Sequence, residues 1–125
     1  LLQSLPSKSP YHKIWTDVMD GLISLCVNTD ILDEYEEKLA EYSSKEIAHN
    51  VVEAIATLST TTLQNTYVHF ELLPGDADDN KFVDCAIASN AELIVTNDKD
   101  FNPLKSIPWP KVEIMRIEDF VKTIE

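Results

Sequence analysis

Glycine and histidine are scarce in this chain of 125 residues, and each shortage excludes a class of functional site. The two glycines, Gly21 and Gly75, are isolated, whereas dinucleotide-binding fingerprints and P-loops need clustered glycines. The three histidines, His12, His49 and His69, show neither HxxxH nor HxH spacing, and no serine lies in a G-x-S-x-G elbow. The sequence therefore argues against a nucleotide-cofactor enzyme of those kinds, a zinc hydrolase and a serine hydrolase.

Basic residues are also few. Ten Lys and Arg residues stand against 22 Asp and Glu residues, which gives a net charge of −12. A protein with this charge repels a polyanion over most of its surface, because it cannot gain affinity by releasing the counterions of many phosphates. Any nucleic acid that it handles must therefore be bound locally.

Long apolar runs and cysteines are scarce as well. No run approaches the ~20 apolar residues that a membrane span needs, and the N-terminus has no signal-like apolar region. The two cysteines, Cys26 and Cys85, lie inside short apolar runs, where a thiol usually behaves as a small buried hydrophobic group. We expect a soluble, cytoplasmic protein with reduced cysteines and no membrane contact. Its length and its 44% hydrophobic content predict one domain over residues 1–125.

The spacing of apolar residues predicts alternating helices and strands. The expected helices are 9–21, 28–42, 43–58, 80–89 and one from Glu118 onward, and Ser43 with Glu46 is expected to form a capping box at the start of the third. The expected strands are 22–27, 67–73, 92–96 and 112–117. A polar break is expected at 60–66. This order predicts an α/β fold with a mainly parallel sheet and helices on both of its faces. Ligands of such sheets bind beyond the carboxyl ends of the strands.

Carboxylates gather at two edges of this arrangement. Residues 76–84 read Asp-Ala-Asp-Asp-Asn-Lys-Phe-Val-Asp and open a helix, and residues 94–100 read Ile-Val-Thr-Asn-Asp-Lys-Asp and end a strand. If the βαβ interpretation holds, the two edges converge at one end of the sheet. Carboxylate and amide oxygens are hard ligands, so the sequence predicts a site for Mg²⁺ or Mn²⁺.

Asp79 is the leading candidate ligand of the first segment, and Asp76, Asp78 and Asn80 surround it. The alternative is that these side chains cap the helix, satisfy its free backbone N–H groups and favour its dipole. Asp84 follows Asn80 by one helical turn in an otherwise apolar helix. Its carboxylate therefore either faces solvent or points into the same cleft.

Asp98 is the leading candidate of the second segment, with Asp100 and Thr96 as secondary candidates. The alternative role of Asp98 is to cap a short helix that follows. Lys81 and Lys99 lie beside the two acidic edges, where they either contact a substrate phosphate or offset the repulsion between carboxylates.

The predicted helix after Asn28 is strongly acidic. Glu34 and Glu36 flank opposite sides of its apolar stripe, so that helical periodicity does not decide which of them faces a site. The alternative is that the whole acidic face of this helix, with both glutamates, is only exposed to solvent.

Four segments resemble the PIN domain family in order and spacing, specifically the branch that includes toxins of toxin–antitoxin systems. They are Ser-Pro-Tyr at 9–11, Ile-Leu-Asp-Glu-Tyr-Glu-Glu at 31–37, Asp-Ala-Asp-Asp-Asn-Lys-Phe at 76–82 and Ile-Val-Thr-Asn-Asp at 94–98. The resemblance implies a three-layer α/β/α sandwich whose acidic residues bind Mg²⁺ or Mn²⁺ and cleave RNA phosphodiesters. It assigns the catalytic and metal-binding positions of the family to Glu34, to Asp79 or Asn80, and to Asp98; Asp84 is an added candidate ligand.

The resemblance also implies a strand ending in Asp-Thr-Asn, whose Asp binds the metal, and Leu1 matches the residues just after that motif. We therefore expect that this strand and this ligand are missing from the sequence. A small antitoxin protein and a homodimer are further expectations from the resemblance. Two alternatives to RNA cleavage stay open, namely a non-catalytic PIN-like interaction module and a phosphohydrolase of small molecules on a similar α/β fold.

Overall fold

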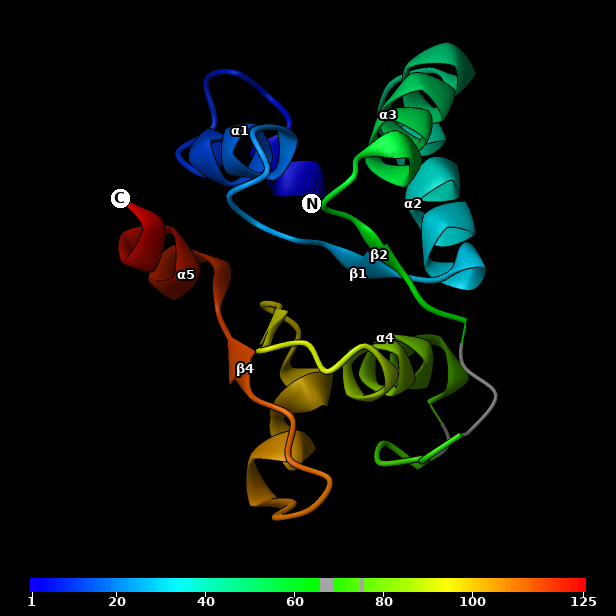
Figure 1. Cartoon of the computed structure of the whole chain (residues 1–125), viewed down its shortest axis with the longest axis vertical. Helices are drawn as coiled ribbons and strands as arrows, with labels where there is room; N and C mark the ends of the chain where they lie inside the picture. Colours follow the sequence, from blue (N-terminus) through cyan, green and yellow to red (C-terminus); the bar gives the residue numbers. More distant parts are fainter. Residues whose placement is uncertain (66–68, 75) are drawn as a thin grey trace. The chain divides into compact units, whose positions relative to one another are not determined.

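The computed structural model of the protein describes residues 1–65, 69–74 and 76–125. The backbone divides into two compact units, Leu1–Leu63 and Gln64–Glu125, and each unit is described by itself. In the described residues, helices alternate with short strands, and the strands pair in parallel (Figure 1). The predicted α/β fold class with parallel pairing is confirmed. A single domain over residues 1–125 stays a prediction.

The first unit is built around two packed helices and one pair of strands. Its elements are η1 (Leu2–Ser4), α1 (His12–Met19), β1 (Cys26–Val27), α2 (Thr29–Tyr42), α3 (Lys45–Thr57) and β2 (Thr62–Leu63). In Figure 1, α2 (cyan) and α3 (green) lie side by side. The strands β1 and β2 pair in parallel, with Cys26 opposite Thr62 and Val27 opposite Leu63.

The helix ends of the first unit follow from local hydrogen bonds. Asn28 caps α2 as predicted, because its side-chain oxygen accepts a hydrogen bond of 2.8 Å from the N–H of Ile31. The predicted capping box at Ser43 is wrong by one residue. Ser44 caps α3 by accepting from the N–H of Ile47 at 3.1 Å, whereas the Ser43 hydroxyl donates to the carbonyl of Leu39 and ends α2.

The first helix is shorter than predicted. Ser9 does not cap it, because its hydroxyl oxygen accepts a hydrogen bond from the N–H of Tyr11 in a turn that precedes α1. At the other end, Gly21 has a φ of 80°, a left-handed conformation that suits glycine and stops the helix where the sequence predicted.

Two strand predictions in this unit need correction. The strand expected over residues 22–27 is confined to β1, because the N–H groups of Leu22 and Ile23 donate to the carbonyl of Asp17 at the end of α1. The polar break expected over residues 60–66 contains β2. Both side chains of β2 are exposed, so its pairing depends on backbone groups and leaves no hydrophobic pattern in the sequence.

The second unit contains α4 (Ala77–Ala88), β3 (Ile94–Val95), the 3₁₀ helix η2 (Lys99–Ser106), β4 (Ile114–Met115) and α5 (Ile117–Ile124). The strands β3 and β4 pair in parallel, with Ile94 opposite Ile114. Its hydrophobic core consists of Leu73, Val83, Ala86, Phe101, Leu104 and Val112. Both α4, through Val83 and Ala86, and η2, through Phe101 and Leu104, contribute to this core.

The strand predicted over residues 67–73 is not present in its described part. Residues 66–68 lie outside the described residues, and residues 69–73 form no strand. Glu71 has a φ of 50°, which is incompatible with extended backbone. The N–H groups of Phe70 and Leu73 donate to the side chains of Asp84 and Asn80, in place of a neighbouring strand.

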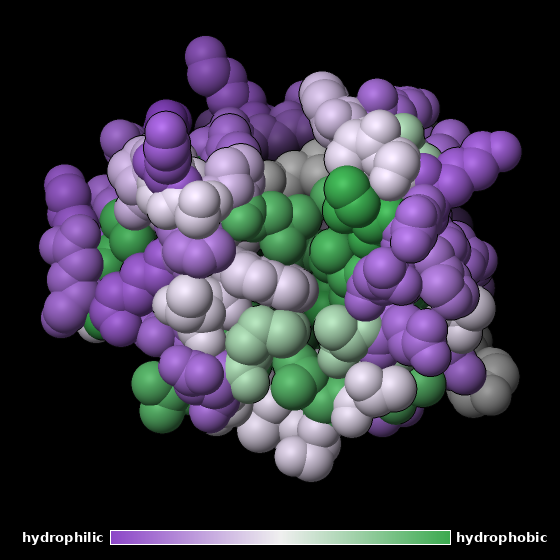
Figure 2. Space-filling model, turned by 90° about the horizontal axis from the view of Figure 1, so that it is seen from above, coloured by the Kyte–Doolittle hydropathy of each residue, from purple (hydrophilic) through white to green (hydrophobic). Residues whose placement is uncertain are grey.

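The surface agrees with the composition. On the face drawn in Figure 2, hydrophilic side chains cover much of the surface, in keeping with the net charge of −12. Among the described residues, every helix is too short or too polar to cross a bilayer.

Candidate functional site

The first turn of α4 brings two carboxylates together. The Asp76 side chain accepts a hydrogen bond of 3.1 Å from the N–H of Asp79, and the Asp76 carbonyl accepts one of 2.9 Å from the N–H of Asn80. Asp76 is therefore the N-cap, and α4 begins at Ala77 and not at Asn80 as predicted. The capping alternative is correct for Asp76, and it leaves the Asp79 carboxylate beside that of Asp76.

The first turn of η2 supplies the second acidic edge. The Asp98 side chain caps this helix by accepting a hydrogen bond of 2.9 Å from the N–H of Asp100. The Asp98 N–H in turn donates to the hydroxyl of Thr96 at 3.1 Å. Thr96 and Asp98 thus hold the backbone from which the exposed Asp100 side chain projects.

The two edges meet, as the sequence predicted. One carboxylate oxygen from each of Asp76, Asp79 and Asp100 lies within 4.8 Å of the others. Two oxygens that bind one Mg²⁺ at roughly 2.1 Å can be at most about 4.2 Å apart. The three side chains would therefore need to move only slightly closer together to bind this ion. Three hard, anionic oxygen donors are suited to Mg²⁺ or Mn²⁺, and the residues present fit such a metal.

Negative charge is concentrated in this cluster. The pKa of the Asp79 carboxyl is raised from 3.8 to about 7, first by burial, then by a side-chain hydrogen bond with Asp76 and by repulsion from Asp76, Asp98 and Asp100. Asp98 therefore lies near enough to act on Asp79 through its charge. A divalent ion would relieve this concentration of negative charge.

Two candidate ligands of the same helix face elsewhere. The Asn80 side chain accepts from the N–H of Leu73 at 3.0 Å and donates to the carbonyl of Leu73 at 2.7 Å. The side chain of Asp84 is 3% exposed, and its oxygens lie 3.1 Å from the N of Phe70 and 3.4 Å from Nδ1 of His69. The solvent-facing alternative for Asp84 is wrong. Metal binding by Asn80 or Asp84 stays a prediction, and both side chains have a structural role that accounts for their burial.

The two candidate phosphate-binding lysines differ in their surroundings. Lys99 is exposed at the first position of η2, between Asp98 and Asp100. The ammonium group of Lys81 lies 5.6 Å from the centre of the Phe82 ring, within the range of a cation–π contact. Their contact with a phosphate stays a prediction.

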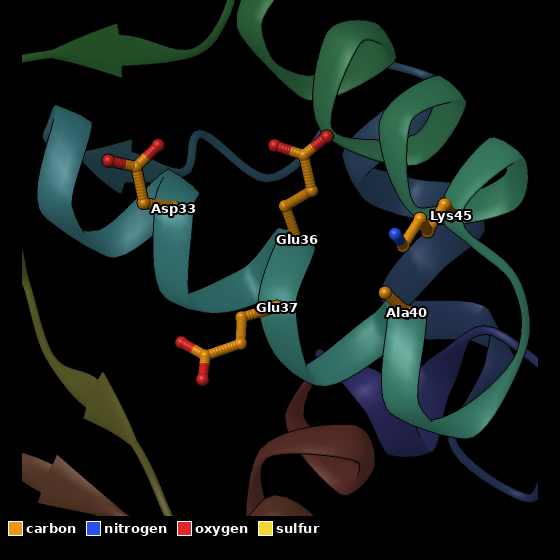
Figure 3. A pocket seen from close by; sticks show the side chains of 5 residues that line it. All are labelled: Asp33, Glu36, Glu37, Ala40 and Lys45. Atoms are coloured by element: carbon orange, nitrogen blue, oxygen red, sulfur yellow. The ribbon is translucent and has the colours of Figure 1, made fainter.

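Glu34 lies on α2 and is half-buried. It belongs to the first unit and the aspartate cluster to the second, so its predicted role as a metal ligand remains a prediction. Beside it along α2, the first unit contains a cavity of about 380 Å³ lined by Asp33, Glu36, Glu37, Ala40 and Lys45. Figure 3 shows Asp33 and Glu36 directed to one side of α2 and Glu37 to another.

The residues that accompany Asp79 were only secondary candidates in the sequence. A three-residue spacing in a helix places Asp76 and Asp79 on one face, and this spacing is the local signal for their pairing. The sequence contains no comparable signal that favours Asp100 over Asp98, because the choice depends on how η2 packs against α4.

One of three comparisons with known proteins gave a match. The family model of the PIN domain matches residues 1–100, a range that includes Glu34 and the whole aspartate cluster. Searches among curated proteins and among solved structures gave no match. PIN domains are typically metal-dependent nucleases, and the three clustered carboxylates suit a metal. With its matched range and its carboxylate cluster, the chain belongs to the PIN domain family.

Proposed function

We propose that this protein is a metal-dependent endoribonuclease that hydrolyses RNA phosphodiesters with Mg²⁺ or Mn²⁺. The observation that carries the proposal is the approach of Asp76, Asp79 and Asp100 oxygens to within 4.8 Å of one another. The typical nuclease activity of PIN domains supports it. RNA as the substrate rests on the resemblance to the toxin branch of the family.

Each aspartate has a distinct role in this proposal. Asp79 binds the metal after losing its proton, and Asp76 and Asp100 complete the ligands from the second unit. Asp98 orients Asp100 through its cap and adds negative charge, either beside the metal or as a further ligand. Glu34 is the proposed ligand from α2. When bound, the divalent ion would activate a water for in-line attack and stabilise the charge at phosphorus.

A bound metal would also reduce the repulsion between this acidic protein and RNA, because it neutralises carboxylates where the phosphate must approach. A chain with a charge of −12 repels RNA, and the repulsion is strongest where acids are concentrated. With the metal bound, a phosphate can approach the aspartate cluster. Lys99, exposed between Asp98 and Asp100, is the nearest proposed phosphate contact along the chain, and Lys81 is the second.

We also propose a toxin–antitoxin setting in the cytoplasm. A small antitoxin protein would cover the cleft and place a basic side chain among the acids, since a guanidinium group pairs well with carboxylates. A homodimer is part of the same proposal.

Cleavage of structured RNAs by the natural full-length protein with Mn²⁺ tests the proposal. Asp79→Asn should lower the rate at least about 100-fold, because even groups that only orient a metal ligand change activity 10- to 100-fold. Asp119→Asn is the matched control, since Asp119 is exposed in the first turn of α5 and is not part of the aspartate cluster. Both variants are checked for folding by circular dichroism.

The other outcomes separate the alternatives. Equal cleavage by both variants would show that a contaminant is responsible. A folded protein that binds Mn²⁺ but cleaves no RNA is a non-catalytic interaction module. Hydrolysis of a phosphate monoester without cleavage of RNA would identify a phosphohydrolase.

A further inference from the structure

A stretch without acidic residues follows the aspartate cluster. Residues 101–112 contain no Asp or Glu and two lysines, Lys105 and Lys111, in a chain whose net charge is −12. This stretch lies beyond residue 100, where the match to the PIN domain ends. Its local positive charge is therefore a property of this chain that the family match does not assign.

The stretch is firmly anchored in the core of the second unit. Leu104 and Val112 are 1% and 7% exposed, and Ile107 packs against the same core cluster. Pro108 and Pro110 restrict the backbone between these anchors, because the proline ring fixes φ. The segment from Ile107 to Val112 therefore presents its exposed side chains in a defined position.

The exposed side chain at the centre of this segment is Trp109, which is 81% exposed. A tryptophan offers a large apolar face that folding normally buries, and here Leu104 and Val112 are buried while Trp109 is exposed. Lys105 and Lys111 are exposed on either side of it in sequence. Lys111 lies 4.0 Å from Glu113, whereas no ion pair of Lys105 occurs among the described residues.

We propose that Trp109 is a stacking platform for an unpaired base of an RNA strand, and that Lys105 and Lys111 contact the adjoining phosphates. This inference rests on the proposed nuclease function. Every base offers a flat aromatic face, and an exposed aromatic ring beside cationic groups is the usual means of binding single-stranded nucleic acid. The charge of the segment favours an anionic partner such as the RNA backbone over a neutral or basic protein surface.

The position of the platform suits the aspartate cluster. The helix η2 begins with Asp100 in its first turn and carries Lys105 in its last turn. At a rise of about 2 Å per residue in a 3₁₀ helix, these two residues are roughly 10 Å apart along the axis. A strand whose phosphate contacts Lys105 can therefore extend along η2 to the carboxylates.

Binding of a uridine octamer to the Asp79→Asn protein in Mg²⁺, where cleavage is slowed and the cation still offsets the negative charge of the protein, tests the platform. We expect the RNA to quench the fluorescence of Trp109, and Trp109→Phe to abolish that quenching while it keeps most of the affinity. Trp109→Ala should weaken binding about five- to tenfold, the lower part of the range for one stacked base. Lys105→Gln should reduce the slope of log affinity against log salt by about 0.7, the value for one phosphate contact.

Tyr42→Ala is the matched control. Tyr42 is 80% exposed but follows Glu41 on the acidic helix α2, so its removal should leave RNA binding unchanged. Absence of RNA-induced quenching, or equal affinity of Trp109→Ala and the natural protein, would overturn the platform. Loss of self-association in Trp109→Ala with unchanged RNA binding would identify the loop as a protein contact and would also overturn it.

The two proposals fail in different ways. Binding that depends on Trp109 in a protein that never cleaves RNA refutes the nuclease function and supports the platform. Cleavage that depends on Asp79, with the same KM in Trp109→Ala, supports the nuclease function and refutes the platform.

Discussion

Asn80 bonds to the backbone of Leu73 with both polar atoms of its side chain, at 3.0 Å to the N and 2.7 Å to the O. The side chain of Asn80 is buried, and Leu73 belongs to the core of the second unit. The Leu73 carbonyl also accepts a hydrogen bond of 3.1 Å from the N–H of Asp76. These hydrogen bonds therefore hold Leu73 against the first turn of α4, where Asp76 and Asp79 lie.

Asn80→Asp should destabilise the protein by about 1–3 kcal/mol, because a carboxylate cannot donate to the Leu73 carbonyl and would place a buried charge against that oxygen. Urea denaturation in EDTA measures the change, with Asn50→Asp on the exposed face of α3 as the control. Unchanged stability together with tighter Mn²⁺ binding would instead assign Asn80 to the metal site.

Asp84→Ala should cost about 1–3 kcal/mol of stability, since the N–H of Phe70 would lose its acceptor. Asp84→Asn should cost less, because an amide oxygen can still accept from Phe70. The Mn²⁺ affinity of Asp84→Asn, measured by calorimetry, should stay within about twofold of the natural value, given that loss of a ligand has a far larger effect. A tenfold loss in a stably folded variant would restore Asp84 as a ligand.

The metal-free protein should lose stability as the pH rises from about 4 to about 7. The pKa of Asp79 is about 7 in the folded protein and 3.8 as its ordinary value, so between these values the folded state holds a proton that the unfolded state has released. Stability then falls with rising pH. Thermal unfolding in EDTA at several pH values measures this change, and Asp79→Asn should reduce the slope. The same slope in the variant would show that another group titrates.

Mn²⁺ binding should have the opposite pH dependence. The metal competes with the proton on Asp79, so its dissociation constant should rise about tenfold for each pH unit below 7. Asp100→Asn should weaken binding about tenfold or more at pH 8, whereas Asp119→Asn should leave it unchanged. Calorimetric titrations at pH 6, 7 and 8, on both sides of the Asp79 pKa of about 7, provide the measurement. Equal affinities for the two variants would remove Asp100 from the site.

The helices were largely predictable from the sequence because their signals are local. The cap at Asn28 and the stop at Gly21 depend on residues within one or two turns, and both are confirmed. The strands were less predictable. Each is two residues long, and β2 is defined by backbone pairing with a strand distant in sequence, so that its exposed side chains carry no signal.

The sequence by itself determined the chemistry of the site, since clustered aspartates at a helix start and a strand end favour a hard divalent cation. It also determined that the two acidic edges meet, through the alternation of helices and strands. Tertiary structure alone decided which carboxylates come together. The packing of η2 and α4 on one core brings Asp100 to Asp76 and Asp79. The side chains of Asn80 and Asp84 instead accept hydrogen bonds from the backbone of Leu73 and Phe70, because buried N–H groups need acceptors.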